Sequence, residues 1–244
     1  MIILSSDYDG TLNTRILELR KNIRELKRYR ELGNIFVLNT GRSYESIMHE
    51  VEEYGIPFDY LCCNDGAVVF DEHLDVVNET NLTERQKNHI KSLTVSNPSF
   101  KIGSFYSAKE KKSIEIEHPI EIEVVRTDDH RFEDFIRDLD PQNLDLSYFQ
   151  WHNSLYIKNQ TSKSRALDHV IAHLGSEIDS RDIYTIGDEG NDLEMIQNHR
   201  GFRMLESSPK LWFKTWRVVP EVYYLLKYLN LKSKFEQRAK QKCR

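Results

Sequence analysis

The sequence predicts an α/β protein in which a doubly wound parallel sheet is interrupted by an inserted α+β domain. Short apolar runs alternate with helical patterns at both ends of the 244-residue chain, an arrangement typical of parallel strands joined by right-handed crossovers. The middle of the chain instead carries several strand patterns in close succession, which favours an antiparallel sheet. We therefore expect a core formed by residues 1–80 and 159–244, and an insert formed by residues 81–158.

The first part of the core repeats a unit of strand, polar loop and helix. An apolar run at residues 1–4 is followed by a helical pattern over residues 16–32. In the next unit, the run at residues 35–38 precedes a helical stripe that starts at Tyr44 and ends before Gly55. A third strand and the two strands of a hairpin are expected at residues 60–63, 68–70 and 74–77.

The insert and the last part of the core follow from the same kinds of pattern. We expect the insert to contain helices at residues 83–93 and 131–139, and strands at residues 100–106, 114–124, 144–149 and 154–157. The parallel pattern then resumes, with helices at residues 164–174, 193–198 and from Pro220 onward, and a strand at residues 183–186. One Rossmann-like core is therefore expected to continue after the insert.

The composition is that of an ordinary globular protein and excludes several classes. Hydrophobic residues make up 39% and charged residues 30%, and the net charge of −5 argues against a nucleic-acid surface over the whole protein. No run approaches the ~20 apolar residues of a membrane span, and the N-terminus lacks a cleavable leader pattern. Cys62, Cys63 and Cys243 lack the spacing of a disulfide framework or zinc site. We expect a cytoplasmic protein with no nucleic-acid and no membrane partner.

Two aspartates follow the first apolar run directly. Asp7 and Asp9 can point the same way because side chains alternate along a strand, and Gly10 lets the chain turn behind them. Ligands of open α/β sheets bind beyond the carboxyl ends of the strands. There, one carboxylate can attack phosphorus while a second transfers the proton. Taken alone, the pair is more often an Asx turn.

Three further loops after predicted strands carry polar groups suited to the same chemistry. Thr40, with the backbone N–H groups that follow it, can hold phosphate oxygens near a helix N-terminus. Lys163, at the start of a predicted helix, can balance the charge of a phosphoryl group, and Lys158 is a nearby alternative. Asp188 and Asp192 offer the carboxylate oxygens that Mg²⁺ prefers. Each feature alone has a plainer explanation, as an N-cap turn, an exposed lysine or an acidic turn.

Together and in this chain order, the four segments resemble the four motifs of the haloacid dehalogenase-like (HAD) phosphatases. The segments are Asp7-Tyr8-Asp9-Gly10-Thr11, Thr40-Gly41-Arg42, Lys163, and Gly187-Asp188 with Asn191-Asp192. Asn64-Asp65-Gly66-Ala67 is similar to the N-G-A loop of the Cof-like branch, whose C2-type α+β cap lies between the second and third motifs. The predicted insert has that position and size, so the resemblance covers nearly the whole chain.

The resemblance implies a Mg²⁺-dependent phosphoric monoester hydrolase that forms a phosphoaspartate. Asp7 would be the nucleophile and Asp9 the general acid and base. The implied substrate-binding residues are Thr40, Gly41, Arg42, Lys163 and Asn191. The implied Mg²⁺ ligands are Asp7, the Asp9 carbonyl, Asp188 and Asp192, with Asn191 or Asp192 acting directly or through water. The expected partner is a small phosphorylated metabolite such as a sugar phosphate, and the expected state is a monomer or homodimer.

Some features depart from the family pattern or leave alternatives open. Tyr8 stands where an apolar residue is usual, and we expect it to affect packing only, on the face opposite the acids. Glu206-Ser207 stand where the family commonly has an Asn-Ala pair, so the substrate contacts of that rim are not predicted. A phosphomutase of the phosphomannomutase type shares the first motif. A phosphate-sensing module without turnover is the alternative from another class.

Three other patterns receive structural interpretations. His169 and His173, four residues apart on a predicted helix, lack the intervening Glu of the zinc proteases and are not expected to bind metal. Aromatic residues of the insert could stack on a sugar, but we expect them in its core; they are Tyr148, Phe149 and Trp151. The basic tail could contact nucleic acid or acidic lipid, but we expect a solvated helix end; its cations are Lys232, Lys234, Arg238, Lys240, Lys242 and Arg244.

Overall fold

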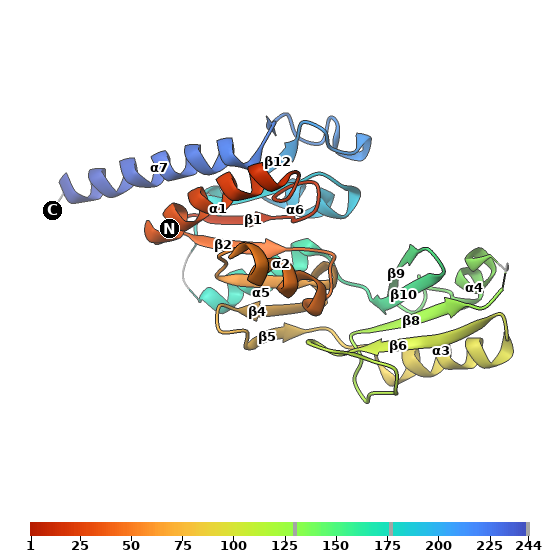
Figure 1. Ribbon diagram of the computed structural model, residues 1–244. Helices are drawn as coiled ribbons and strands as arrows, with labels where there is room; N and C mark the ends of the chain where they lie inside the picture. Colours follow the sequence, from red (N-terminus) through yellow and green to blue (C-terminus); the bar gives the residue numbers. More distant parts are fainter. Residues whose placement is uncertain (129–130, 176–177, 243–244) are drawn as a thin grey trace. The chain divides into compact units, whose positions relative to one another are not determined.

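The computed structural model describes residues 1–128, 131–175 and 178–242, and the chain divides into two compact units. The first unit comprises residues 1–77 and 162–244, and the second comprises residues 78–161 (Figure 1). Cys243 and Arg244, which the sequence analysis considered, lie outside the described residues, as do the side chains of Lys240 and Lys242.

An eight-stranded sheet forms the centre of the first unit, in the order β13-β12-β11-β1-β2-β3-β4-β5. Its strands are β1 (Ile3–Ser6), β2 (Ile35–Asn39), β3 (Tyr60–Cys63), β4 (Val68–Asp71), β5 (Val76–Glu79), β11 (Ile183–Gly187), β12 (Arg200–Met204) and β13 (Val218–Val219). Pairing is parallel from β13 to β3, whereas β4 is antiparallel to β3. The predicted doubly wound core is confirmed, with the predicted hairpin at one edge.

Helices cover both faces of this sheet, which is why β1 is buried along its whole length (Figure 1). They are α1 (Ile16–Glu31), α2 (Tyr44–Tyr54), α5 (Lys163–Leu174), α6 (Leu193–Asn198) and α7 (Val222–Lys242), with 3-10 turns at Asn64–Gly66, Ser180–Asp182, Gly190–Asp192 and Pro209–Leu211. The apolar side of α5 packs on Ile3, Val37 and Cys62. Helix α1 packs with β2 and α7.

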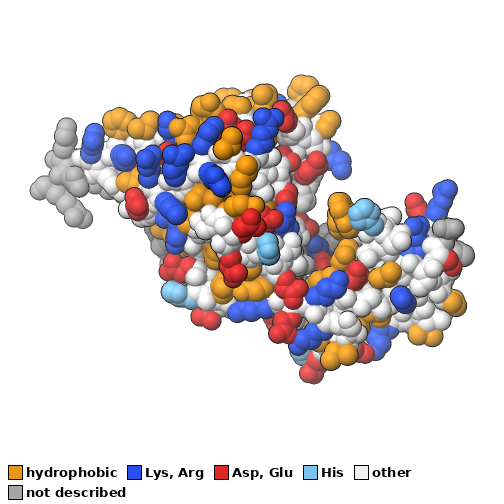
Figure 2. All heavy atoms as spheres, viewed as in Figure 1, with side chains coloured by type: hydrophobic (Ala, Val, Ile, Leu, Met, Phe, Trp, Pro, Cys, Tyr) orange, Lys and Arg blue, Asp and Glu red, His pale blue; other side chains and the backbone are white. Residues whose placement is uncertain are grey.

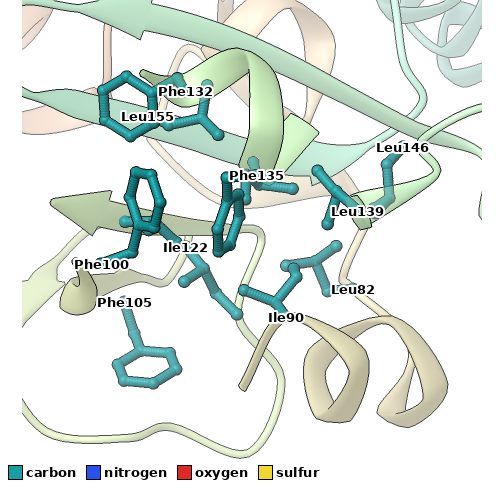
Figure 3. Close-up of a cluster of buried hydrophobic side chains, with 12 residues drawn as sticks. Leu82, Ile90, Phe100, Phe105, Ile122, Phe132, Phe135, Leu139, Leu146 and Leu155 are labelled. Carbon is teal, nitrogen blue, oxygen red and sulfur yellow. The ribbon is translucent and has the colours of Figure 1, made fainter. Parts of the chain in front are cut away.

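The second unit is a five-stranded sheet in the order β7-β6-β8-β10-β9, with two helices. Its elements are α3 (Glu84–Ser96), β6 (Phe100–Tyr106), β7 (Lys111–Lys112), β8 (Glu121–Arg126), α4 (Phe132–Leu139), β9 (Leu146–Trp151) and β10 (Ser154–Asn159). Figure 3 shows its core, where the ring of Phe100 lies 5.4 Å from that of Phe132 and 4.9 Å from that of Phe135. The predicted α+β character is therefore confirmed.

The structure corrects the predicted strands in both units. The pattern over residues 114–124 predicts one strand, but β8 begins only at Glu121, because Pro119 has no N–H to donate to a neighbouring strand. Ile114 is accordingly 73% exposed. The strands β7, β12 and β13 were not predicted, because β7 and β13 are only two residues long, and β12 has the sequence RGFRM and lacks an apolar run.

The aromatic residues of β9 are a further correction, because they do not belong to a core. Tyr148, Phe149 and Trp151 are 45%, 55% and 58% exposed. The reason is topological: β9 is an edge strand of its sheet, so it has a neighbour on one side only.

Among the residues that the structure describes, no helix has the length and apolar character needed to cross a bilayer.

Candidate functional site

The carboxyl ends of three neighbouring parallel strands bring the predicted motifs to one edge of the sheet. Strand β1 lies between β2 and β11, and Asp7, Thr40 and Asp188 directly follow these three strands. The Asp7 N–H donates to the carbonyl of Ile186 at 3.0 Å, so the pairing of β1 with β11 extends to Asp7. The backbone therefore fixes where the Asp7 side chain starts.

Lys163 is the centre of a buried ion cluster. Its Nζ lies 2.5 Å from Asp7 Oδ1 and 2.7 Å from Asp192 Oδ1. The side chains of Lys163, Asp7 and Asp192 are 1%, 8% and 0% exposed. Lys163 is the first residue of α5, whose N-cap Ser162 accepts a hydrogen bond through its hydroxyl from the backbone N–H of Arg165, three residues further along the chain. The alternative lysine, Lys158, lies on β10 in the second unit.

The cluster has a surplus of negative charge. Burial raises the pKa of Asp7 well above its usual value, although Lys163 acts in the opposite direction. Burial also raises the pKa of Asp188, and the charge of Asp192 adds to this shift. For Lys163, burial alone would lower the pKa, but Asp7 and Asp192 outweigh it and the net shift is upward. A divalent cation would neutralise this surplus.

Asp7, Asp188 and Asp192 form a group that fits such a cation. One carboxylate oxygen from each lies within 4.8 Å of the others. Thr11 Oγ1 donates to Asp188 Oδ1 at 2.6 Å. Gly10 has φ +74°, and a Cβ at this position would lie 2.3 Å from Asp188 Oδ2, so only glycine leaves room for that carboxylate. A set of carboxylate oxygens is what Mg²⁺ prefers.

Asp192 supports the loop that carries Asp188. Its Oδ2 accepts hydrogen bonds from the backbone N–H groups of Asp188 and Glu189, both at 3.0 Å, while Oδ1 accepts from Lys163. Because each carboxylate oxygen has about two lone-pair sites, these three bonds leave one site, on Oδ1, for a metal ion or a water molecule. The geometry favours Asp192 as the group that holds Asp188 and Lys163 in place.

The segment Asn64-Asp65-Gly66 lies against the start of α5. The backbone is left-handed at all three residues, with φ of 51°, 52° and 90°. A Cβ on Gly66 would lie 2.5 Å from the carbonyl oxygen of Ser162. Glycine therefore allows the segment to contact the turn from which Lys163 enters the ion cluster.

The second aspartate, Asp9, contacts Arg42 and not the ion cluster. Arg42 Nε donates to Asp9 Oδ2 and Nη2 donates to Asp9 Oδ1, both at 2.7 Å, and these bonds raise the pKa of Arg42. We had expected Asp7 and Asp9 to point the same way by strand alternation. In the structure the two side chains have different partners, and strand alternation does not extend to Asp9 because β1 ends at Ser6. A metal contact of the Asp9 carbonyl stays a prediction.

Tyr8 and Glu50 hold Arg42 from its other side, a role that was not predicted. Arg42 Nη1 donates to Glu50 Oε1 at 3.0 Å, and the Tyr8 hydroxyl donates to Glu50 Oε2 at 2.8 Å. The guanidinium carbon lies 5.1 Å from the centre of the Tyr8 ring. Partial burial alone would raise the pKa of Glu50, but its bonds with Tyr8 and Arg42 lower it. Tyr8 therefore affects the position of Arg42, and not packing alone.

The remaining predicted substrate-binding residues lie in the loops after β2 and β11. Thr40 is fully buried, and its hydroxyl accepts from the Arg42 N–H at 3.1 Å. Asn191 Nδ2 donates to Asp65 Oδ1 at 2.9 Å, and the same oxygen would lie 3.0 Å from a Cβ at Gly41. Asp65 thus joins the two loops. Its motif had been recognised in the sequence, but this role had not.

The loop after β12 reaches the same edge of the sheet. The Ser208 N–H donates to the Asp188 carbonyl at 2.7 Å, and Trp212 Nε1 donates to the Ser207 carbonyl at 3.1 Å. The Glu206-Ser207 segment, which departs from the family pattern, therefore borders the site. His169 and His173 are exposed on α5, and the described residues place neither of them in a candidate metal group.

Comparisons with known proteins agree on one family. The sequence pattern of the haloacid dehalogenase-like hydrolases matches residues 4–107 and 94–214. No curated protein matches this sequence. A phosphatase of the haloalkanoate (HAD) enzyme superfamily from Bacteroides thetaiotaomicron is 19% identical with a TM-score of 0.74, and the match covers 94% of this chain and 95% of that one.

Two further solved structures show the same fold. A hypothetical protein from Geobacillus kaustophilus is 19% identical with a TM-score of 0.76, and the match covers 94% of this chain and 99% of that one. A sugar phosphatase of HAD subclass IIB is 14% identical with a TM-score of 0.69, covering 93% of this chain and 98% of its own. At these identities the likeness concerns the fold.

Proposed function

This chain belongs to the haloacid dehalogenase-like hydrolases, and from its site we propose that it is a Mg²⁺-dependent phosphatase of a small phosphomonoester. The observation that carries this proposal is the buried pair of Asp7 and Lys163, 2.5 Å apart at the carboxyl end of the central strand. A nearly dry carboxylate whose position is fixed by a lysine is suited to act as a nucleophile, and the two neighbouring aspartates suit a divalent cation.

In the proposed first step, an oxygen of Asp7 forms a bond to phosphorus while the bond from phosphorus to the leaving oxygen breaks. Lys163 holds Asp7 Oδ1 and offsets the repulsion between the carboxylate and the phosphoryl group. Asp7 and Asp188 would hold Mg²⁺, and Asp192 would keep Asp188 in position. The ion would supply further positive charge next to the transferred group. The product of this step is a phosphoaspartate at Asp7.

Asp9 is the proposed acid and base. Its protonated carboxyl gives a proton to the leaving oxygen, and the resulting carboxylate then takes a proton from the water that attacks phosphorus. This second attack releases phosphate and restores Asp7. The bidentate pair with Arg42 has to open first. Phosphate oxygens are an alternative partner for a guanidinium group, so substrate binding would itself release Asp9.

We propose that the second unit acts as a cap that selects the substrate. Residues 78–161 form a compact unit with a hydrophobic cluster of its own, and they lie between the second and third motifs. One similar structure is a sugar phosphatase, which supports a sugar phosphate or a related metabolite as substrate. Substrate contacts by Thr40, Gly41, Arg42 and Asn191 belong to the same proposal.

Removing divalent metal is expected to stop the reaction. Protein treated with EDTA should release phosphate from p-nitrophenyl phosphate at least about a hundredfold more slowly than protein supplied with Mg²⁺. Mg²⁺ should also raise the melting temperature, because it binds the folded carboxylate cluster. A hundredfold excess over the dissociation constant corresponds to about 2.7 kcal/mol of stabilisation.

Two aspartate variants make this test specific. Asp188→Asn should lose the Mg²⁺-induced rise in melting temperature together with the activity. Asp179→Asn is the matched control, because Asp179 is 41% exposed and pairs with Arg181, and it should keep both. Full activity in EDTA, with no effect of Mg²⁺ on melting, would contradict the proposed metal site.

A further inference from the structure

The C-terminal helix α7 presents a stripe of large apolar side chains to solvent. The apolar stripe consists of Tyr224, Tyr228, Leu231 and Phe235. These residues follow one another at intervals of four, three and four, which places them on one face of the helix, and they are 51% to 67% exposed. The opposite side of α7, which includes Leu225 and Leu229, is buried. The apolar stripe therefore takes no part in the core of the first unit.

A row of cations borders the apolar stripe on the side of α7 that faces α1. Lys227, Lys234 and Arg238 are exposed and lie seven and four residues apart, next to the stripe. Asn230 lies three residues after Lys227 and four before Lys234, so it is on the same side. Its Nδ2 donates to Glu25 Oε2 of α1 at 3.1 Å, which shows that this side faces α1.

A cavity of about 300 Å³ lies between α1 and α7 beside this row. It is lined by Lys21, Arg24, Glu25, Arg28, Tyr223 and Lys227. Four cations thus accompany one carboxylate, and that carboxylate already accepts from Arg28 at 2.6 Å and from Asn230. Lys21 also approaches Glu221, at 3.6 Å. The lining keeps a surplus of positive charge that suits an anionic group.

The exposed loop between β12 and β13 adds aromatic side chains to the same unit. Phe213 is 99% exposed, Trp216 is 83% exposed and Trp212 is 47% exposed. Lys210 and Lys214 alternate with them in the sequence. Figure 2 shows hydrophobic side chains along the upper edge of this unit, over α7 and over this loop.

Charge decides which partner fits this surface. Residues 203–238 contain eight Lys and Arg but only three Glu, whereas the whole chain has a net charge of −5. A second copy would bring like charges together, which is unfavourable. Aromatic side chains next to Lys and Arg are typical of surfaces that lie in the headgroup region of a bilayer. Such a surface needs no spanning helix, and a lipid partner here departs from the sequence-based expectation of a solvated helix end without a membrane partner.

We propose that α7 and the loop after β12 bind the surface of an anionic lipid bilayer, with a phosphate-bearing headgroup in the cavity between α1 and α7. The test is co-sedimentation of the full chain with vesicles of phosphatidylcholine alone or mixed with phosphatidylglycerol. We expect at least about tenfold tighter binding to the mixed vesicles at low salt. The double variant Lys227→Gln and Lys234→Gln should weaken that binding about thirtyfold, which is two charges at about 1 kcal/mol each.

Variants of the apolar stripe and of distant sites complete the design. Tyr228→Ser with Phe235→Ser should weaken vesicle binding. Val95→Ser with Ile114→Ser should not, although these apolar residues of the second unit are even more exposed, at 83% and 73%. All of these variants should keep the hydrolysis of soluble p-nitrophenyl phosphate, which separates this proposal from the proposed function.

Several results would overturn the lipid proposal. The first is equal binding of the protein to both kinds of vesicle. The second is a dimer in sedimentation that Tyr228→Ser with Phe235→Ser abolishes. The third is tighter binding of the protein to a single-stranded DNA than to the mixed vesicles. Displacement from vesicles by millimolar inorganic phosphate would also overturn it, because the cavity would then be a site for a free anion.

Discussion

Asp7→Asn is expected to remove phosphate release almost completely, lowering kcat by about 10⁴-fold or more. The substitution keeps the shape of the side chain and an oxygen that can accept from Lys163. It removes the anionic oxygen that would bond to phosphorus, so no phosphoaspartate can form. The measurement is Mg²⁺-dependent release of phosphate from p-nitrophenyl phosphate.

This loss should not come from unfolding. Burial raises the pKa of Asp7, so keeping this carboxylate ionised in the folded protein costs free energy, and the cost is present above its unfolded pKa. A neutral Asn avoids that cost, and the melting temperature of Asp7→Asn without metal should equal or exceed that of the wild type. A folded Asp7→Asn variant with wild-type activity would place the nucleophile elsewhere.

Lys163→Met is expected to destabilise the first unit by about 3–5 kcal/mol and to abolish activity. The Lys163 side chain is 1% exposed, and its ammonium group bonds the carboxylates of Asp7 and Asp192, which would lose their buried partner. Methionine fills a similar volume, so the loss of stability would come from the missing charge and not from a cavity. Urea unfolding measures the change in the free energy of unfolding. Mg²⁺ should restore part of the stability, because it replaces some of the missing positive charge.

The pH dependence of this contribution has a definite sign. The pKa of Lys163 is raised in the folded state, so its stabilising effect is fully present below the unfolded pKa of about 10.4 and is lost at higher pH. At neutral pH the variant therefore lacks the whole contribution.

Lys87→Met is the control that separates stability from activity. Lys87 is also buried and pairs with Glu84 at 2.6 Å, but it lies in the second unit. The Lys87→Met variant should be less stable than the wild type, while the molecules that remain folded keep their activity. Equal activity per folded molecule for Lys163→Met and Lys87→Met would contradict a role for Lys163 in the chemistry.

The fold was predictable because its core strands are short apolar runs with clear helical patterns between them. The run at residues 35–38 became β2, and the helix of residues 193–198 has those bounds in the structure. The strand β12 has no such run, since its place in the sheet depends on pairing with β11 and not on its own hydrophobicity. The edge strand β9 carries aromatic residues that a propensity scale alone assigns to a core.

The sequence predicted those parts of the site whose positions depend on where the parallel strands end. Asp7 and Asp188 meet because parallel neighbours end at one edge of the sheet. The contacts of Arg42 with Asp9 and Glu50 depend on where a loop and a helix bring side chains together, and Tyr8 and Glu50 are 42 positions apart in the sequence. No local pattern marks Glu50. The same holds for Asp65, whose bond to Asn191 joins two loops 126 positions apart.

The most direct test asks whether Asp7 carries the phosphoryl group. Enzyme mixed with excess substrate and Mg²⁺ is quenched in acid and treated with borohydride, which reduces an aspartyl phosphate to homoserine, and peptide mass spectrometry then locates the change. The expected result is homoserine in place of Asp7 in the wild type and no such change in Asp7→Asn. Reduction at another aspartate, or rapid phosphate release with Asp7 always unmodified, would contradict the proposed mechanism.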